Sequence, residues 1–123
     1  MDFQESKGIY IQIADQLCNR ILSGEWVIDE RIPAIREMAA LLGVNPNTVT
    51  RSYKELMDLE IIYNKRGIGY FVSPDAHKHI RENKRKEFVI NELPHLFTTM
   101  DQLGLNWNDM EQYYNNYRKT GEV

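Results

Sequence analysis

The segment around Gly43 constrains the fold more than any other part of this 123-residue chain. Apolar residues at steps of three and four predict two helices flanking it, over 35–42 and 46–59. Ala39 provides a small residue where these helices cross, and Val49 provides a β-branched core residue. Gly43 itself suits a left-handed turn. This spacing predicts a helix-turn-helix, whose second helix enters the major groove of DNA.

The segments on either side of this motif predict a small compact domain. An amphipathic pattern over 9–23 indicates a first helix. After the motif, two β-prone runs at 61–63 and 70–72 are separated by a polar, glycine-containing turn at 64–69. We therefore expect a mainly α fold with a small β-hairpin wing, a winged helix-turn-helix, over residues 1–74.

The helix expected at 46–59 carries the candidate DNA-contacting side chains. Asn45 is placed to cap its free amides, and Pro46 suits the first helical position. Asparagine can pair with adenine, arginine with guanine, threonine with phosphate or a thymine methyl, and lysine with phosphate. The residues opposite Val49, at 100° per residue, are Asn47, Thr50, Arg51, Lys54 and Asp58. The alternative is that they form only a solvated face, which amphipathicity alone predicts.

Net charge does not point to nucleic acid. The chain has 15 Lys and Arg against 18 Asp and Glu, a formal charge of -3. A DNA-binding face must therefore be a local basic cluster on an acidic body. The hairpin adds such a cluster, because its turn carries Lys65 and Arg66 beside Gly67. Taken alone, this turn is equally compatible with a solvated loop.

Four ordered blocks of sequence resemble one family of regulators. They read IYIQI at 9–13, IPAIREMA at 32–39, LGVNPNTV at 42–49 and GIGYFV at 67–72. In this order they resemble the winged-helix transcriptional regulators of the GntR family, and within it the short YtrA-like subfamily. The resemblance covers residues 9–72. It implies control of transcription, and further implies that the target is a membrane-transport operon or the chain's own operon.

The resemblance also implies which residues contact DNA. Arg36, preceding the second helix, would contact the operator, residues 45–51 would start the groove-facing helix, and Arg66-Gly67 would enter the minor groove. The combined candidate set is Arg36, Asn45, Asn47, Thr48, Thr50, Arg51, Lys54, Lys65, Arg66 and Gly67. Two departures limit the transfer of base preference. Ala34 replaces a common serine, and Pro46 and Thr50 stand where many members have arginine.

The segment 75–123 is expected to form a two-helix dimerisation region. Its first helical pattern ends at Gly104 and contains Pro94, so we expect a kink or break near 90–94. Asn106 can cap a last helix. The predicted dimer contacts are Val89, Leu93, Leu96, Met100, Leu103, Trp107, Met110 and Tyr114. The alternative is that this tail packs on its own DNA-binding domain.

The leading interpretation is a cytoplasmic homodimeric DNA-binding regulator, a repressor, acting on double-stranded DNA with a two-fold symmetric operator. A small-molecule effector would bind an interfacial pocket near Trp107, Tyr113, Tyr114 or Tyr117. A regulator controlled by a partner, or one without a ligand, is equally compatible with the sequence. Two other classes remain open: a winged-helix protein-interaction adaptor without DNA binding, and a small-molecule sensor acting mainly through the aromatic tail.

Catalysis, cofactors and membrane insertion have no support in the sequence. No apolar run is long enough to cross a bilayer. Glu92 and His95, and His77 and His79, have metal-like spacings but lack further ligands, so we expect no metal site. Cys18 is expected to be a small core residue rather than a nucleophile.

Overall fold

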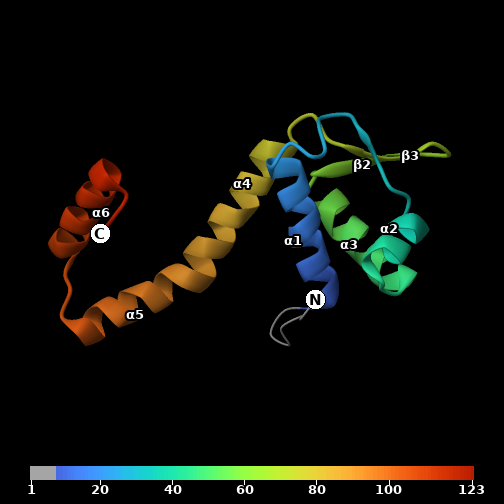
Figure 1. The fold of residues 1–123 in the computed structure, drawn as a ribbon. Helices are drawn as coiled ribbons and strands as arrows, with labels where there is room; N and C mark the ends of the chain where they lie inside the picture. The colour runs from blue at the N-terminus through green and yellow to red at the C-terminus, as the bar shows by residue number, and fades with distance from the viewer. Residues whose placement is uncertain (1–7) are drawn as a thin grey trace. The chain divides into compact units, whose positions relative to one another are not determined.

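The computed structural model describes residues 8–123 and divides the chain into two compact units, Met1–Asn83 and Lys84–Val123. The sequence places the boundary earlier, between residues 74 and 75. The first unit extends further because Ala76 and Ile80, on the next helix, are buried in its core. Its elements are α1 (Ile9–Leu22), β1 (Arg31–Ile32), α2 (Ile35–Leu42), α3 (Pro46–Asp58), β2 (Ile62–Lys65) and β3 (Gly69–Val72) (Figure 1).

The helices of the first unit surround one apolar core. Ile13, Leu17 and Ile21 of α1 and Val49, Tyr53 and Leu56 of α3 are buried there. Cys18 is a buried member of the same cluster, as predicted. Gly43 ends α2 in the left-handed conformation, with φ of 68°, as its place in the turn requires. Trp26, in the loop after α1, is 6% exposed. The helix-turn-helix predicted around Gly43 is therefore present.

The sheet has three antiparallel strands in the order β1-β3-β2. Arg31 pairs with Phe71, and Lys65 pairs with Gly69. Strand β1 was not predicted, because two residues are too few for an alternating pattern. The hairpin strands also run closer to their turn than expected, so that only residues 66–68 connect them. The expected hairpin is confirmed, with a shorter turn and a third strand.

Alternation along the strands gives the sheet two different faces. Ile32, Ile62 and Val72 are buried against the helices. Side chains at the intervening positions lie on the opposite face, which we call the outer face of the sheet: Arg31, Tyr63, Lys65 and Phe71, together with Gly69. Figure 1 shows α1, α2 and α3 together on one side of this sheet.

The second unit begins within a helical run and ends in a separate helix. Helix α4 (Ala76–Glu87) is followed by the π-helical segment η1 (Phe88–Glu92) and by α5 (Leu93–Leu103), with Pro94 in its first turn. The N–H of Leu93 donates to the carbonyl of Phe88, five residues earlier. Because proline has no N–H to give to residue 90, the regular helical ladder is interrupted here. The break expected near Pro94 takes this π-helical form.

The last helix is separated from α5 by a glycine turn. Gly104 ends α5 with φ of 68°, and α6 (Trp107–Thr120) follows. Asn106 accepts a hydrogen bond from the N–H of Asp109 at 2.9 Å, and the Asp109 carboxylate accepts one from the N–H of Asn106 at 2.9 Å. This reciprocal capping box confirms Asn106 as the helix start.

Candidate nucleic-acid interface

The N-terminal half of α3 presents a polar, exposed surface opposite the core. Oδ1 of Asn45 accepts a hydrogen bond from the N–H of Asn47 at 2.8 Å, which fixes where the helix begins. Asn47 is exposed, Thr48 is half-buried, and Thr50 is exposed with its hydroxyl donating to the carbonyl of Pro46 at 3.0 Å. Asn45 therefore acts as a cap, and Asn47 has an exposed amide at the same helix end.

Arg51 is held against the first helix. Its guanidinium carbon lies 4.1 Å from the centroid of the Tyr10 ring. The same turn of α3 is joined to α1 by Ser52, whose hydroxyl donates to the carbonyl of Tyr10 at 2.7 Å. Such stacking leaves the in-plane N–H groups of a guanidinium available to a ligand. Tyr10 was not singled out in the sequence as a partner of the α3 face.

The other cation on this face has a partner of its own. Nζ of Lys54 lies 3.0 Å from Oδ2 of Asp58, one turn later, and both side chains are largely exposed. Exposed pairs of this kind contribute roughly 0–1 kcal/mol. Lys54 and Asp58 lie on the predicted face, but the acid partly neutralises the base. Arg51 is therefore the stronger cation of the two for an anionic ligand.

Arg36 lies at the start of α2. The sequence interpretation placed it before the helix, whereas it is the second residue of α2 and is exposed. Ala34 is the N-cap and makes no side-chain cap, as expected from the missing hydroxyl. Arg36 therefore projects from a helix end whose amides have no side-chain acceptor.

A buried tyrosine ties the start of α2 to α3. The hydroxyl of Tyr53 donates to the carbonyl of Pro33 at 2.6 Å, and the Tyr53 ring packs edge-on against Tyr70 at 4.9 Å. Burial raises the pKa of Tyr53, so its hydroxyl stays protonated as the donor. The link connects the segment between β1 and α2 with the helix that carries Arg51.

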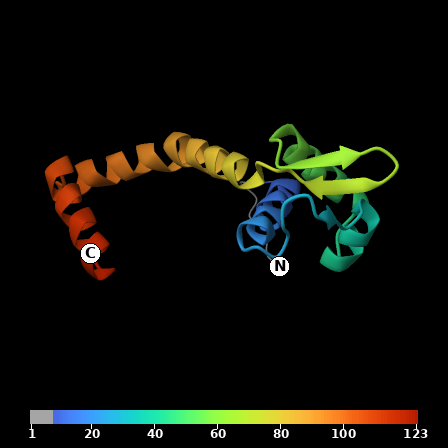
Figure 2. The same cartoon turned by 90° about the horizontal axis from the view of Figure 1, so that it is seen from above.

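The hairpin turn brings Arg66 and Gly67 together. Both are exposed, and Gly67 has a φ of 78°, a conformation that favours glycine. Figure 2 shows this turn extending beyond the two strands. Lys65 points elsewhere: its Nζ lies 4.7 Å from the centroid of Phe71, which stacks on Tyr63 at 5.6 Å. Of the two predicted cations, Arg66 belongs to the turn and Lys65 to the outer face.

The comparisons with known proteins agree on one family. The sequence profile described as "Bacterial regulatory proteins, gntR family" matches residues 9–72. The HTH-type transcriptional regulator YhcF of Bacillus subtilis is 37% identical over 108 residues, covering 88% of each chain. The chain belongs to the GntR family.

Further relatives of this GntR regulator include a known repressor and two relevant structures. The repressor YtrA of B. subtilis is 37% identical over 68% of this chain and 65% of its own length. A GntR-family regulator from Bacteroides thetaiotaomicron is 38% identical with a TM-score of 0.82, covering 94% of this chain and all of that one. The DNA-binding domain of AraR, in complex with operator ORR3, is 25% identical with a TM-score of 0.51, covering 59% and 95%. The short YtrA-like architecture expected from the sequence is therefore confirmed.

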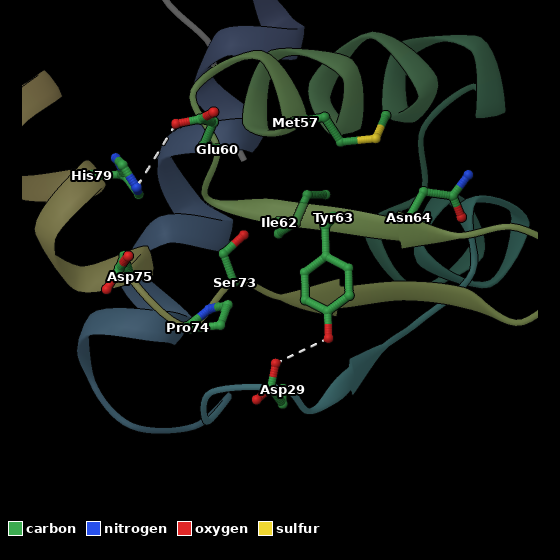
Figure 3. Close-up of a pocket in the computed structure, with 10 residues that line it drawn as sticks. All are labelled: Asp29, Met57, Glu60, Ile62, Tyr63, Asn64, Ser73, Pro74, Asp75 and His79. Carbon is green, nitrogen blue, oxygen red and sulfur yellow. Dashed lines mark hydrogen bonds and ion pairs between the residues drawn. The ribbon is translucent and has the colours of Figure 1, made fainter.

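A pocket of about 610 Å³ lies at the other end of α3 in the GntR regulator (Figure 3). Met57 and Ile62 line it with apolar atoms, and the remaining lining residues include carboxylates. The hydroxyl of Tyr63 donates to Asp29 at 2.9 Å, while Glu60 lies 3.9 Å from His79. Partial burial, and then this hydrogen bond to Asp29, raise the pKa of Tyr63. An acidic pocket does not suit a DNA backbone, so it lies outside the candidate interface.

The second unit exposes half of the eight predicted dimer contacts. Met100 is 7% exposed, and Leu93, Leu96 and Met110 are half-buried. The other four are exposed: Val89 49%, Leu103 68%, Trp107 66% and Tyr114 61%. Leu96, Trp107, Met110 and Tyr114, with Glu111 and Asn115, line a pocket of about 580 Å³. Tyr113 and Tyr117, also expected near an effector pocket, are not among its lining residues.

Two further observations concern the described residues. Within residues 8–123, no helix is both long and apolar enough to span a bilayer. In that same part of the chain, no three His, Cys, Asp or Glu side chains gather closely enough to hold a metal ion.

Proposed function

We propose that this GntR regulator is a homodimeric, sequence-specific repressor that binds a two-fold symmetric operator. The observation that carries the proposal is the exposed polar face at the start of α3, with Arg51 stacked on Tyr10. A helix start combined with an arginine and an asparagine suits the major groove, where base edges carry a distinct pattern for each base pair. YtrA of B. subtilis, named a repressor, supports this mode of regulation.

The predicted residues divide into base-reading and backbone-binding groups. We assign base contacts to Asn47 and Arg51, because both are exposed at the groove-facing start of α3. Arg36 at the start of α2 suits a phosphate. Arg66 and Gly67 suit the adjacent minor groove, since glycine permits close approach and arginine favours its negative potential.

The homodimer is supported by the apolar surface of the second unit. Of the buried hydrophobic residues in the described chain, Met100 alone lies in Lys84–Val123, so this unit has almost no core of its own. Large apolar side chains exposed on α5 and α6 include Phe97, Leu103 and Trp107. A surface of this kind requires a partner. A second copy satisfies it with a self-complementary interface and also supplies the second half-site reader.

An effector would act through the same unit. The pocket beside Trp107 and Tyr114 is largely apolar with two polar residues, Glu111 and Asn115, which is the usual make-up of a small-molecule site. Its test is ligand-dependent thermal stabilisation that is lost when Trp107 is replaced by alanine. A compound that raises the melting temperature of the wild type and of Trp107→Ala equally does not bind this pocket.

The decisive experiment is selection of binding sites from random duplex DNA at several salt concentrations. We expect a two-fold symmetric site whose affinity falls steeply with salt. Arg51→Ala should relax base preference and weaken operator binding by about 1–3 kcal/mol. Arg66→Ala should weaken binding while keeping the wild-type melting temperature. Binding without sequence preference would contradict the proposal. A recovered site also tests whether the target is a transport operon or the chain's own operon.

A further inference from the structure

We propose that Arg31, on β1, is a further DNA-binding residue that binds a phosphate beside the wing, the hairpin of β2 and β3. This inference rests on the proposed function and extends it to the outer face of the sheet. The sequence contains no signal for this residue, because β1 is only two residues long. Its position depends on the pairing of β1 with β3 of the hairpin.

The guanidinium of Arg31 contacts Gly69. A Cβ atom at residue 69 would lie 2.8 Å from Nε of Arg31 and 3.5 Å from its Cζ. The guanidinium therefore lies directly over Gly69, in the space that the Cβ atom of any other residue would fill. Gly69 begins β3 immediately after the turn at 66–68. The charge of Arg31 therefore lies next to the wing turn.

Among residues 8–123, Arg31 has no acidic partner within ion-pair distance. Its side chain is exposed. Glu30 and Glu37 line a pocket together with Arg31, but neither is within ion-pair distance of its guanidinium. An exposed, unpaired guanidinium is suited to bind a phosphate through two parallel hydrogen bonds.

Lys65 is the cross-strand partner of Gly69. Its ammonium is drawn back over the rings of Phe71 and Tyr63, 4.7 Å and 5.9 Å from their centroids. The ammonium of Lys65 thus lies over the aromatic rings of the outer face, whereas the guanidinium of Arg31 lies over Gly69. Arg31 replaces Lys65 as the second cation of the wing, beside Arg66.

Arg31 is also fixed relative to the groove-facing helix. Pro33, two residues after Arg31, accepts the hydrogen bond of Tyr53 at 2.6 Å, and Ile32 is buried in the core. Arg36 follows within the next turn. Arg31 is thus anchored between the wing and α2, where a DNA strand bound by both would pass. A phosphate at this position completes a row of contacts by Arg36, Arg31 and Arg66.

The test measures operator and non-operator binding by full-length protein over a range of salt. Arg31→Gln should make the slope of log affinity against log salt shallower by about 1 for each bound chain, and should weaken both duplexes equally. Arg31→Lys should restore the wild-type slope, because the charge remains. Arg81→Gln removes the same charge from the exposed face of α4 and should leave the slope unchanged. Melting temperatures identify any variant that is unfolded.

Four outcomes of this test bear differently on Arg31 and on the proposed function. A wild-type slope and affinity for Arg31→Gln, with Arg66→Gln weakened, would overturn the role of Arg31 and leave the regulator intact. Equal losses in Arg31→Gln and Arg81→Gln would also overturn it, because the effect would then be one of overall charge. Absence of sequence-preferring binding by the wild-type protein would overturn both. A loss confined to Arg31→Gln and Arg66→Gln supports both.

Discussion

The guanidinium of Arg51 lies on the ring of Tyr10, at 4.1 Å from its centroid, and so joins α3 to α1. An unstacked arginine samples many rotamers, and ordering it on binding costs roughly 0.5–1.5 kcal/mol. The stacked arginine has already lost that freedom. In the proposed complex, Tyr10 would therefore act on DNA through Arg51, as a positioning residue in α1.

Replacing the ring of Tyr10 should reduce both affinity and base preference. Tyr10→Leu removes a cation–π contact of about 0.5–2 kcal/mol, so Arg51 should accept a wider range of bases. Tyr10→Phe keeps the ring and should retain the wild-type base preference. Binding-site selection with each variant measures the profile. Identical profiles for Leu and Phe would show that stacking plays no part in recognition.

Removing the acid beside Lys54 should strengthen DNA binding. Asp58→Asn breaks the 3.0 Å pair and removes a negative charge from the predicted DNA face. Since the pair is exposed, the free energy of unfolding should change by less than about 1 kcal/mol. Affinity measured by fluorescence anisotropy should rise, most strongly at low salt. Unchanged affinity would place this end of α3 away from the DNA.

The two asparagines at the start of α3 should behave differently. Asn45→Ala removes the cap on the N–H of Asn47 and should lower the free energy of unfolding by about 0.5–2 kcal/mol. Asn47→Ala keeps that cap and should alter operator affinity with little change in stability. Urea unfolding and operator titration of both variants separate the two effects. A reversed pattern would contradict the assignment of roles.

A charge placed at Trp107 should separate the proposed dimer. Trp107→Asp puts a carboxylate into a desolvated contact and should raise the dimer dissociation constant by at least about 30-fold, the effect of a 2 kcal/mol interface residue. Gln112→Asp introduces the same charge elsewhere on exposed α6 and is the control. Analytical ultracentrifugation gives the constants. Equal values for both variants would remove Trp107 from the interface.

Stability should fall at alkaline pH through Tyr53. Burial raises its pKa above the ordinary value of 10.0, so the folded state holds the proton more tightly than the unfolded state. This contribution is complete below pH 10 and is lost as the pH rises toward the folded-state pKa. Tyr53→Phe should be about 1 kcal/mol less stable near pH 7, because the bond to Pro33 is gone. Urea unfolding from pH 7 to 11 should show a smaller decline for this variant.

Local signals predicted the helices and their ends well. Gly43, Asn45 and Asn106 have the conformations and hydrogen bonds that their residue types favour. Long-range contacts were not predictable in the same way. Strand β1 depends on a partner almost forty residues away, and Arg31 gains its position only through that pairing. Likewise, the pairing of Lys65 with aromatic rings depends on cross-strand register rather than on its place in a basic turn.

The chain has two tryptophans, one in each unit, in opposite environments: Trp26 is 6% exposed and Trp107 is 66% exposed. Each unit therefore contains its own optical reporter. With Trp107→Phe, the remaining emission follows melting of the DNA-binding domain. With Trp26→Phe, the emission of Trp107 should shift to shorter wavelength as the protein concentration rises, because Trp107 moves from water into the proposed subunit contact. The assembly and unfolding of this regulator can thus be followed separately without attaching a dye.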